Sequence, residues 1–281
     1  MIKIKARRIV QGLSLLLLHS SFSVMRDGKP ANWFQAKWLC LPVLSCHACS
    51  LAYTACPIGV LMHSAGWRLF PVFALTMGML LVFGGLLGRF FCGWICPFGT
   101  LQAVLYRIPS PKFKMPHWTA YIKYAVLLVM VFLIPFFLGE LTYGSFCRIC
   151  PAAALQVAIP GWIKNGFNWS VMSAARIAVL IAVIVFVVMS SRSFCKVLCP
   201  IGALMAPLNR ISLWAVKPPT EACISCGKCD RTCSMDVNPS ARILRDIPPS
   251  RQEDCIVCHE CQPVCPVKGK TKGSLKKNSN A

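Results

Sequence analysis

Residues 223–233 and 255–266 read CISCGKCDRTC and CIVCHECQPVCP, and these two runs decide how the C-terminal part of the chain folds. Both have the spacing Cys-x2-Cys-x2-Cys-x3-Cys, and a proline follows the last cysteine of the second run only. This spacing ligates two [4Fe–4S] clusters, and the fourth cysteine of each run binds the cluster of the other run. Zinc sites and disulfides use pairs of cysteines instead. The sequence therefore predicts two [4Fe–4S] clusters.

The ligands of the two predicted clusters follow because each run gives its fourth cysteine to the cluster of the other run. Cluster 1 is assigned Cys223, Cys226, Cys229 and Cys265, and cluster 2 is assigned Cys255, Cys258, Cys261 and Cys233. Thiolates that bind clusters must stay reduced, which excludes an oxidising compartment for this part of the chain. We therefore expect residues 217–267 to form a small α+β domain of the bacterial two-cluster ferredoxin type, which transfers electrons.

The rest of the chain has the composition of a membrane protein. Hydrophobic residues make up 56% of the 281 residues, and 30 Lys and Arg face nine Asp and Glu, a formal net charge of +21. Basic residues that flank membrane segments explain this excess, and we expect no nucleic-acid partner because no such binding motif is present. Seven of the nine acidic residues lie after residue 220. This shift predicts a transmembrane domain over residues 1–216, the ferredoxin-like domain over 217–267 and a basic disordered tail over 268–281.

Four apolar stretches predict an all-α membrane bundle of about four transmembrane helices. They are residues 9–24, 69–88, 121–143 and 171–190. The last three have 20 to 23 residues, enough to cross a hydrocarbon core of roughly 30 Å. The first stretch is shorter and follows four basic residues, so a cleaved signal peptide is the alternative. We expect a retained helix because no convincing cleavage site follows.

Basic residues also predict the orientation of this bundle. They occur before the first stretch, between the second and third, and after the fourth, and basic loops stay in the cytoplasm. The other two loops carry basic residues as well, so the ferredoxin-like domain, which needs a reducing compartment, decides between the two orientations. We therefore expect a multi-pass protein of a bacterial or archaeal cytoplasmic membrane, with both termini and the ferredoxin-like domain in the cytoplasm. The loops at residues 25–68 and 144–170 then lie outside.

A Cys-Pro pair recurs four times before the ferredoxin-like runs, at Cys56, Cys96, Cys150 and Cys199. Proline suits the first turn of a helix, where its missing N–H is not needed. Each pair therefore predicts a helix start, and residues 99–108 are expected to form a short amphipathic helix. A thiolate at such a start lies near the positive end of the helix dipole, which favours the ionised form that binds metals.

Under this topology the four repeats alternate between the two faces of the membrane. The inner set comprises Cys92, Cys96, Cys195 and Cys199, and the outer set comprises Cys46, Cys49, Cys56, Cys147 and Cys150. The inner set predicts a further cluster, redox-active pairs or small buried side chains. For the outer set a metal or cluster site and structural disulfides are both open, because that side can be oxidising. We expect much of the bilayer to separate the two sets.

The motifs FCGWICP at residues 91–97 and FCKVLCPIGAL at residues 194–204, followed by the two ferredoxin-like runs, resemble the NapH type of membrane ferredoxin. The same module is similar to parts of the NosR and MauN proteins. The resemblance implies four membrane helices, cytoplasmic [4Fe–4S] clusters and electron transfer from quinol towards a redox partner outside. The basic pattern does not require the outer set, which implies a different partner or an extra cofactor.

The predicted function is membrane-bound iron–sulfur electron transfer, as the quinol-oxidising subunit of an oxidoreductase. Quinol oxidation needs a proton acceptor near the membrane, and ionisable Glu140 and His19 are the candidates. An ion pair of Glu140 with Arg176 and an interfacial role of His19 are the alternatives. Expected partners are membrane lipid, the quinol pool and another redox protein, such as a cytochrome, a ferredoxin-type subunit or a periplasmic reductase. The alternative functions are an electron-supplying maturation or regulatory factor for another metalloenzyme and a redox-sensing membrane anchor.

Overall fold

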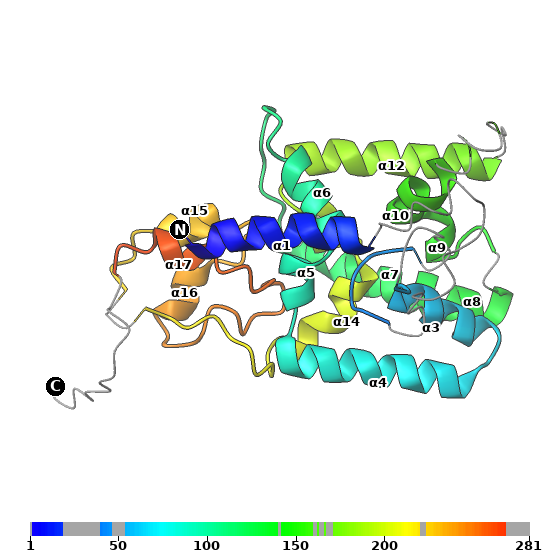
Figure 1. Cartoon of the computed structure of the whole chain (residues 1–281), viewed down its shortest axis with the longest axis horizontal. Coiled ribbons are helices and arrows are strands. Elements are labelled where there is room, and N and C mark those ends of the chain that lie inside the picture. Colours follow the sequence, from blue (N-terminus) through cyan, green and yellow to red (C-terminus); the bar gives the residue numbers. More distant parts are fainter. Residues whose placement is uncertain are drawn as a thin grey trace.

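The computed structural model describes residues 2–18, 40–46, 54–139, 142–159, 162, 166, 171–219 and 223–267. Within these ranges the chain is helical or irregular, and an isolated β-bridge joins Cys40 to Ala55. The long helices run lengthwise around a group of short helices, and the C-terminal domain lies at one end, beside the start of the first helix (Figure 1).

The long helical segments coincide with the predicted apolar stretches. They are α1 Ile2–Leu18, α4 Phe70–Leu87, α12 Val171–Met189 and a continuous series formed by η1 His117–Tyr121, α7 Ile122–Val126, η2 Leu127–Leu133 and α8 Ile134–Leu138. By length and composition two segments can cross a membrane, Phe70–Leu87 and His117–Leu138, and Ala174–Met189 is a shorter apolar helix. The structure thus provides two candidate spans, and the expected number of four stays a prediction.

Two of these helices differ from the expected bounds. The first helix begins at Ile2 instead of residue 9, and residues 19–24 lie outside the described part of the chain. The third segment ends at Leu138 instead of residue 143, and residues Leu127–Leu133, shortly before Pro135, form a π-helix. Proline removes one backbone donor and its ring clashes with the preceding turn, which explains an irregular pattern at this point.

Each of the four Cys-Pro pairs before the ferredoxin-like runs begins a helix, as the sequence predicts. These helices are α3 Pro57–Gly66, α6 Pro97–Leu105, α10 Pro151–Ala153, which continues into η3 Ala154–Ala158, and α14 Pro200–Leu208. The preceding cysteine is extended in all four, with φ between −61° and −73° and ψ between 111° and 126°. Because proline fixes φ near the helical value, the same dipeptide produces the same local structure four times. In three repeats a short helix precedes the pair: α5 Phe90–Trp94, α9 Phe146–Ile149 and α13 Ser193–Val197.

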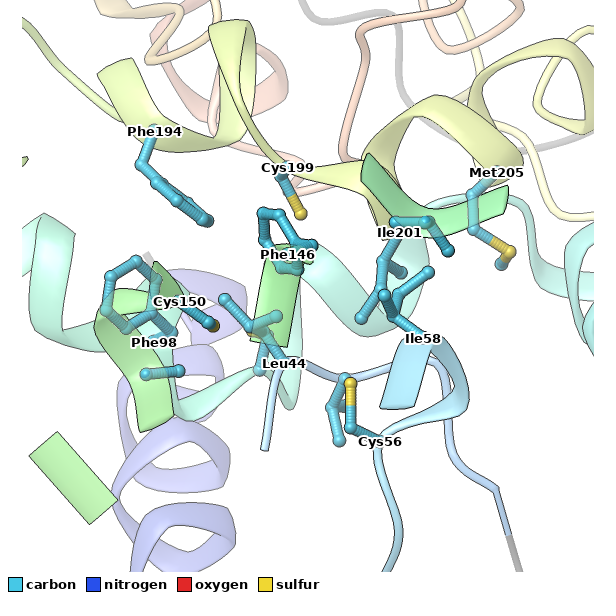
Figure 2. Packing of buried hydrophobic residues seen from close by; sticks show 14 of the residues in the cluster. Leu44, Cys56, Ile58, Phe98, Phe146, Cys150, Phe194, Cys199, Ile201 and Met205 are labelled. Atoms are coloured by element: carbon cyan, nitrogen blue, oxygen red, sulfur yellow. The ribbon is translucent and has the colours of Figure 1, made fainter. Parts of the chain in front are cut away.

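The hydrophobic core lies where these four units meet. Its buried cluster includes the four extended cysteines Cys56, Cys96, Cys150 and Cys199. Figure 2 shows three of them among the aromatic and aliphatic side chains of the core. Phe98 and Phe194, one from each inner repeat, meet edge to face with ring centroids 4.9 Å apart. Close packing in a protein interior holds side chains in defined positions, so the four thiols have fixed places in the core.

The C-terminal domain contains three short helices, α15 Lys228–Thr232, α16 Pro239–Ile243 and α17 Cys261–Val264, and residues 223–267 contain no strand. The predicted α+β fold of this domain is therefore wrong in its β component. Left-handed φ values interrupt the extended backbone at Ser225, Asp236, Asn238, Asp246, Val257 and His259. A strand needs a continuous run of extended residues, and two adjacent prolines at positions 248 and 249 also remove ladder donors.

Ion pairs that are largely buried connect this domain to the helical bundle. Arg7 of α1 forms an ion pair with Glu260, and its Nε also donates a hydrogen bond to the carbonyl of Gly93 at 3.0 Å. Lys196 of α13 lies 2.6 Å from the Asp236 carboxylate. Breaking a buried pair leaves an uncompensated charge, so these contacts define how the domain sits on the bundle.

Candidate iron–sulfur centres

The four cysteines predicted to bind cluster 1 line one cavity. Cys223, Cys226, Cys229 and Cys265 surround an empty volume of about 340 Å³. Cys265 comes from the second cysteine run, and the other three come from the first. Ile224, Ile243 and Val267 also line the cavity. The structure thus brings together the exchanged ligand set that the spacing predicts.

The cysteines predicted to bind cluster 2 are also neighbours. Cys233, Cys255 and Cys258 pack against a small core of Met235, Val237 and Ile256. Burial raises the pKa of Cys261, and the adjacent thiols of Cys258, Cys255 and Cys233 raise it further. The thiol of Cys229, assigned to cluster 1, raises this pKa as well, so thiols of both predicted sites lie near Cys261.

The inner set lines a further cavity inside the bundle, called the inner cavity below. Cys92, Cys96, Cys195 and Cys199 surround an empty volume of about 330 Å³, together with Arg89, Leu44, Phe98 and Ile201. Two of the four Cys-Pro repeats each contribute one Cys-x3-Cys pair to this cavity, Cys92 with Cys96 and Cys195 with Cys199. The cavity therefore has the same number of thiols as the predicted cluster 1 site.

Two arginines occupy equivalent positions beside the inner cavity. Arg89 and Arg192 each precede the first cysteine of a pair by three residues, and each is only 1% exposed. A Cβ added at Gly202 would lie 2.8 Å from Arg89 Nη2, and a Cβ added at Gly99 would lie 3.2 Å from Arg192 Nη1. Each guanidinium thus contacts the glycine of the opposite repeat, and a larger side chain at either glycine would displace it.

These arginines make the inner cavity suitable for an anionic group. Within the described residues, Nε of Arg89 and both Nε and Nη2 of Arg192 have no hydrogen-bond partner. A buried cation with unsatisfied donors is costly. A [4Fe–4S] cluster is held by four cysteine thiolates, which would supply the compensating negative charge. The donor set and the orphaned guanidinium atoms therefore fit a thiolate-bound cluster.

Hydrogen bonds to sulfur add to this fit. Gln102 Nε2 donates to Cys195 Sγ at 3.1 Å, and the amide of Gly202 donates to Cys199 Sγ at 3.4 Å. Such bonds stabilise thiolate sulfur and set the reduction potential of a cluster. Burial raises the pKa of Cys96 to about 12, so a bound cation must replace the proton before this thiol can act as a ligand.

The outer set lines a third cavity, called the outer cavity below. Cys46, Cys56, Cys147 and Cys150 surround an empty volume of about 280 Å³. Cys49, the remaining cysteine of the outer set, lies outside the described residues. Cys56 and Cys150 form no disulfide. The structure therefore brings four of the five outer cysteines together.

The inner and outer cavities are adjacent, which differs from the expected separation by much of the bilayer. Leu44 lines both cavities. Cys56 and Cys150 of the outer set belong to the same buried cluster as Cys96 and Cys199 of the inner set. The sequence suggests opposite faces because the long helices alternate in direction. The short helices that follow the Cys-Pro pairs instead turn into the bundle, so their starts meet near its centre (Figure 2).

The inner cavity is also adjacent to the predicted cluster 2 site. Cys92 packs against the core that holds Cys233, Cys255 and Cys258. A Cβ added at Gly93 would lie only 2.3 Å from the carbonyl oxygen of Ile256. A glycine at this position therefore allows the two backbones to approach, and the two sites share a wall.

Several predicted residues lie outside the described part of the chain. They are Cys49, His19 and Glu140, together with the tail at residues 268–281. Arg176, the proposed partner of Glu140, donates a hydrogen bond from Nε to the carbonyl of Arg148 at 2.9 Å. The quinol-site candidates therefore stay predictions.

Sequence reasoning missed the two buried arginines. The signal was present, because the pattern Arg-x2-Cys-x3-Cys-Pro-x-Gly occurs at residues 89–99 and again at 192–202. Asn209 was missed as well: its Nδ2 donates to the carbonyls of Ser250, Gln252 and Cys255 at 2.6 to 2.9 Å. No motif marks this asparagine, whose role depends on the docked C-terminal domain.

The arrangement of the thiols also bears on the kind of metal. In the described ranges, no group of three or more His, Cys, Asp or Glu side chains is arranged to hold a single metal ion. A zinc site needs its ligands within one tetrahedral sphere of about 2.3 Å Zn–S bonds. A [4Fe–4S] cluster is held instead by four cysteine thiolates, and four cysteines line each of the three cavities.

Comparison with known proteins supports this chemistry. A family model described as "4Fe-4S binding domain" matches residues 69–116 and 173–219. The two matched segments contain Cys92 with Cys96 and Cys195 with Cys199, so they are the segments that form the inner cavity. These two segments of the chain are thus similar to a 4Fe–4S binding domain. No solved structure matches the chain.

Similar proteins come from archaea and bacteria. An uncharacterised protein of Methanocaldococcus jannaschii is 26% identical over 201 residues, which cover 68% of this chain and 67% of that protein. YccM of Escherichia coli, named as a candidate electron transport protein, is 27% identical over 230 residues, or 77% of this chain and 57% of YccM. The regulatory protein NosR of Pseudomonas aeruginosa is 29% identical over 206 residues, or 69% of this chain and 26% of NosR.

These similarities indicate the kind of chemistry involved. The chain is weakly similar to proteins named as electron transport, regulatory and ferredoxin-type proteins. The resemblance to NosR and MauN inferred from the cysteine motifs is confirmed at this level, and the NapH type stays a prediction. The chain spans 57% of the length of YccM and 26% of the length of NosR, so the activities of those whole proteins are not transferred to it.

Proposed function

We propose that this protein is a membrane-integral electron carrier that accepts electrons from quinol and passes them through cysteine-bound [4Fe–4S] clusters to a redox protein. The single observation that carries the proposal is the shared wall between the inner cavity and the predicted cluster 2 site, at Cys92 and Gly93. Electron transfer between centres falls off steeply with distance. A carrier that links the quinol pool of the membrane to a ferredoxin-type domain needs neighbouring redox centres. Adjacent cavities lined by cysteines, in a bundle of apolar helices, would meet this need.

The exposed surface of the helices supports a membrane location. Only 17% of the residues of Phe70–Leu87 and 22% of those of His117–Leu138 are buried. A core helix of a soluble protein would bury most of its apolar side chains. Side chains such as Phe70, Leu75 and Phe137 are 69%, 65% and 74% exposed. Apolar surface of this extent is expected where lipid covers it.

The chain's own residues prepare these sites in three ways. The cysteines supply the thiolates, and the two buried arginines beside the inner cavity balance their charge. The amide of Gly202 and the side chain of Gln102 donate hydrogen bonds to sulfur. Phe98, Ile201 and Leu44 exclude water from the cavity. When bound, a [4Fe–4S] cluster supplies reversible one-electron redox chemistry.

The proposed orientation places the C-terminal domain in the cytoplasm, because cluster thiolates need a reducing compartment. Basic side chains near that end support this orientation, since basic residues stay on the cytoplasmic side. Among them, Arg7, Arg89, Arg192 and Lys196 lie close to the C-terminal domain or the inner cavity. The proposed partners are the quinol pool, lipid and a second redox protein.

A quinol reduction assay tests the proposal. Purified full-length protein in detergent or nanodiscs is mixed anaerobically with a menaquinol analogue, and cluster reduction is followed by visible absorbance and EPR. Reduction of the clusters is expected, and a Cys96→Ser/Cys199→Ser variant should show which signals depend on the inner cavity. Clusters that stay oxidised with excess quinol, yet are reduced by dithionite, would exclude the quinol-dependent role.

A maturation or regulatory role is the second candidate, because one relative is a regulatory protein by name. Deletion of the gene separates the two roles when a dependent metalloenzyme is isolated from the deletion strain. If the metalloenzyme from the deletion strain contains its metal but is not reduced, this protein supplies electrons during turnover. An enzyme that lacks its metal supports a role in maturation.

A further inference from the structure

The outer cavity repeats the construction of the inner cavity. Cys56 and Cys150 immediately precede the helices α3 and α10, just as Cys96 and Cys199 precede α6 and α14. Their backbone angles agree within 12° in φ and 15° in ψ. Two Cys-Pro units therefore meet at each cavity. Two further cysteines complete each set: Cys92 and Cys195 in the inner cavity, and Cys46 and Cys147 in the outer cavity.

The three sites also agree in their number of thiols. Four cysteines line the outer cavity, and four line each of the inner cavity and the predicted cluster 1 site. The cluster 1 site serves as an internal standard, because its cysteine spacing specifies a [4Fe–4S] cluster. The outer cavity thus has the ligand number of a cluster site.

A purely structural role does not explain these thiols. Cys56 and Cys150 form no disulfide although they line the same cavity. Isolated buried cysteines pack as small hydrophobes, but here four cysteines line one cavity. The remaining wall is formed by Leu44, Ile58, Phe146 and small side chains, which protect a bound group from water.

The position of the outer cavity suggests what its occupant does. Leu44 lines both the inner and the outer cavity, so a single side chain lies in both walls. The inner cavity in turn shares a wall with the predicted cluster 2 site through Cys92. Four thiol sites therefore follow one another from the C-terminal domain into the bundle.

We propose that Cys46, Cys56, Cys147 and Cys150 bind an iron–sulfur centre that exchanges single electrons with the inner centre across Leu44. The outer centre is reduced by one electron as the inner centre is oxidised by one, and no bond or proton is transferred in this step. The proposal deepens the proposed function, since it extends the electron path beyond the inner cavity. It needs neither a particular quinone nor a particular partner.

Metal analysis of paired variants tests the site. Full-length protein is purified anaerobically as wild type, as Cys56→Ser/Cys150→Ser and as the matched inner variant Cys96→Ser/Cys199→Ser. A Cys40→Ser variant controls for loss of a buried cysteine, because Cys40 is buried yet lines none of the three cavities. If the outer site binds a cube, the outer double variant should contain about four fewer irons and sulfides per chain than wild type. The Cys40→Ser variant should keep the wild-type content.

Three results would overturn the proposal. Iron and sulfide contents equal to wild type in the folded outer variant would mean that no cluster binds there. One zinc per chain lost in place of iron would show a single-ion site. A disulfide would be indicated if Cys56 and Cys150 resisted alkylation until a reductant was added. If the double variant does not fold, single Cys147→Ser protein is used, and an unchanged EPR spectrum with unchanged iron content would count against the site.

The electron exchange has its own readout. In dithionite-reduced wild type, magnetic interaction between adjacent centres should broaden the EPR signal of the inner centre, and the outer variant should lose this broadening. A fully loaded outer site without any interaction would reject the exchange step. Because dithionite replaces quinol here, failure of this test is distinguishable from failure of the quinol-dependent function.

Discussion

The guanidinium of Arg89 donates a hydrogen bond to the carboxylate of Asp254 at 3.0 Å, and this contact joins the inner cavity to the C-terminal domain. Lys123 of the third long segment pairs with the same carboxylate. The side chains of Arg89 and Lys123 are 1% exposed. Neighbouring Arg89 and Lys123 overcome the effect of burial and lower the pKa of Asp254. One carboxylate thus pairs with two buried cations, one in the turn before α5 and one in α7.

Replacing this carboxylate should weaken domain docking. Asp254→Ala leaves both cations without their partner, and removal of one member of a buried pair costs about 3–5 kcal/mol. We expect a lower midpoint of thermal unfolding by differential scanning fluorimetry. Glu253→Ala is the matched control, because its pair with Arg210 is 35% and 65% exposed and should contribute less than about 1 kcal/mol. Equal midpoints for the two variants would contradict the assigned role of Asp254.

Gly93 should tolerate no side chain. An added Cβ would lie 2.3 Å from the Ile256 carbonyl oxygen, so Gly93→Ala must push the C-terminal domain away from α5, at a cost of about 1–3 kcal/mol. Gly85→Ala in α4 meets open space and should be nearly neutral. Hydrogen exchange of residues 255–260 in the two variants measures this difference. Wild-type protection in Gly93→Ala protein would show that the backbones do not approach.

Asn209 should be needed for the same interface. Its Nδ2 donates to three carbonyls of the C-terminal domain, and its Oδ1 accepts from the amide of Arg89 at 3.1 Å. Asn209→Ala leaves these buried groups unsatisfied, which costs about 1–3 kcal/mol. Thr232→Ala removes an exposed hydrogen bond to Lys228 and serves as control. Limited proteolysis should release the C-terminal domain faster from the Asn209 variant only.

Arg192 should tune the inner centre. Replacing it with leucine removes a buried positive charge, which favours the oxidised, less negative form of a cluster. We expect the midpoint potential of the inner centre to fall by at least about 60 mV, a tenfold change in a one-electron equilibrium. Arg192→Lys keeps the charge and should recover part of the shift. An EPR-monitored redox titration measures this, and an unchanged potential in Arg192→Leu protein with its cluster intact would refute the electrostatic role.

Local patterns were predictable from the sequence, and long-range packing was not. The helix starts at Cys56, Cys96, Cys150 and Cys199 follow from the geometry of proline, which acts within one turn. The apolar helices follow from composition. The adjacency of the inner and outer cavities depends on how short helices turn into the bundle, which no local signal specifies.

The C-terminal domain shows the same limit. Its cysteine spacing predicted which thiols meet, because that pattern is fixed by cluster ligation. The expected strands are absent from residues 223–267, where turns with left-handed residues at Ser225 and Val257 shape the loops around the cysteines. Strand formation depends on pairing between segments, and neither run offers a continuous extended partner.

The central claim is that the cysteines of this chain bind iron–sulfur clusters, and anaerobic purification followed by iron and sulfide analysis with EPR tests it most directly. The account predicts brown protein with at least about eight irons and eight sulfides per chain. Dithionite should then produce EPR signals of reduced [4Fe–4S] clusters. Colourless protein without iron, or protein with zinc at Cys223 to Cys265, would contradict the account.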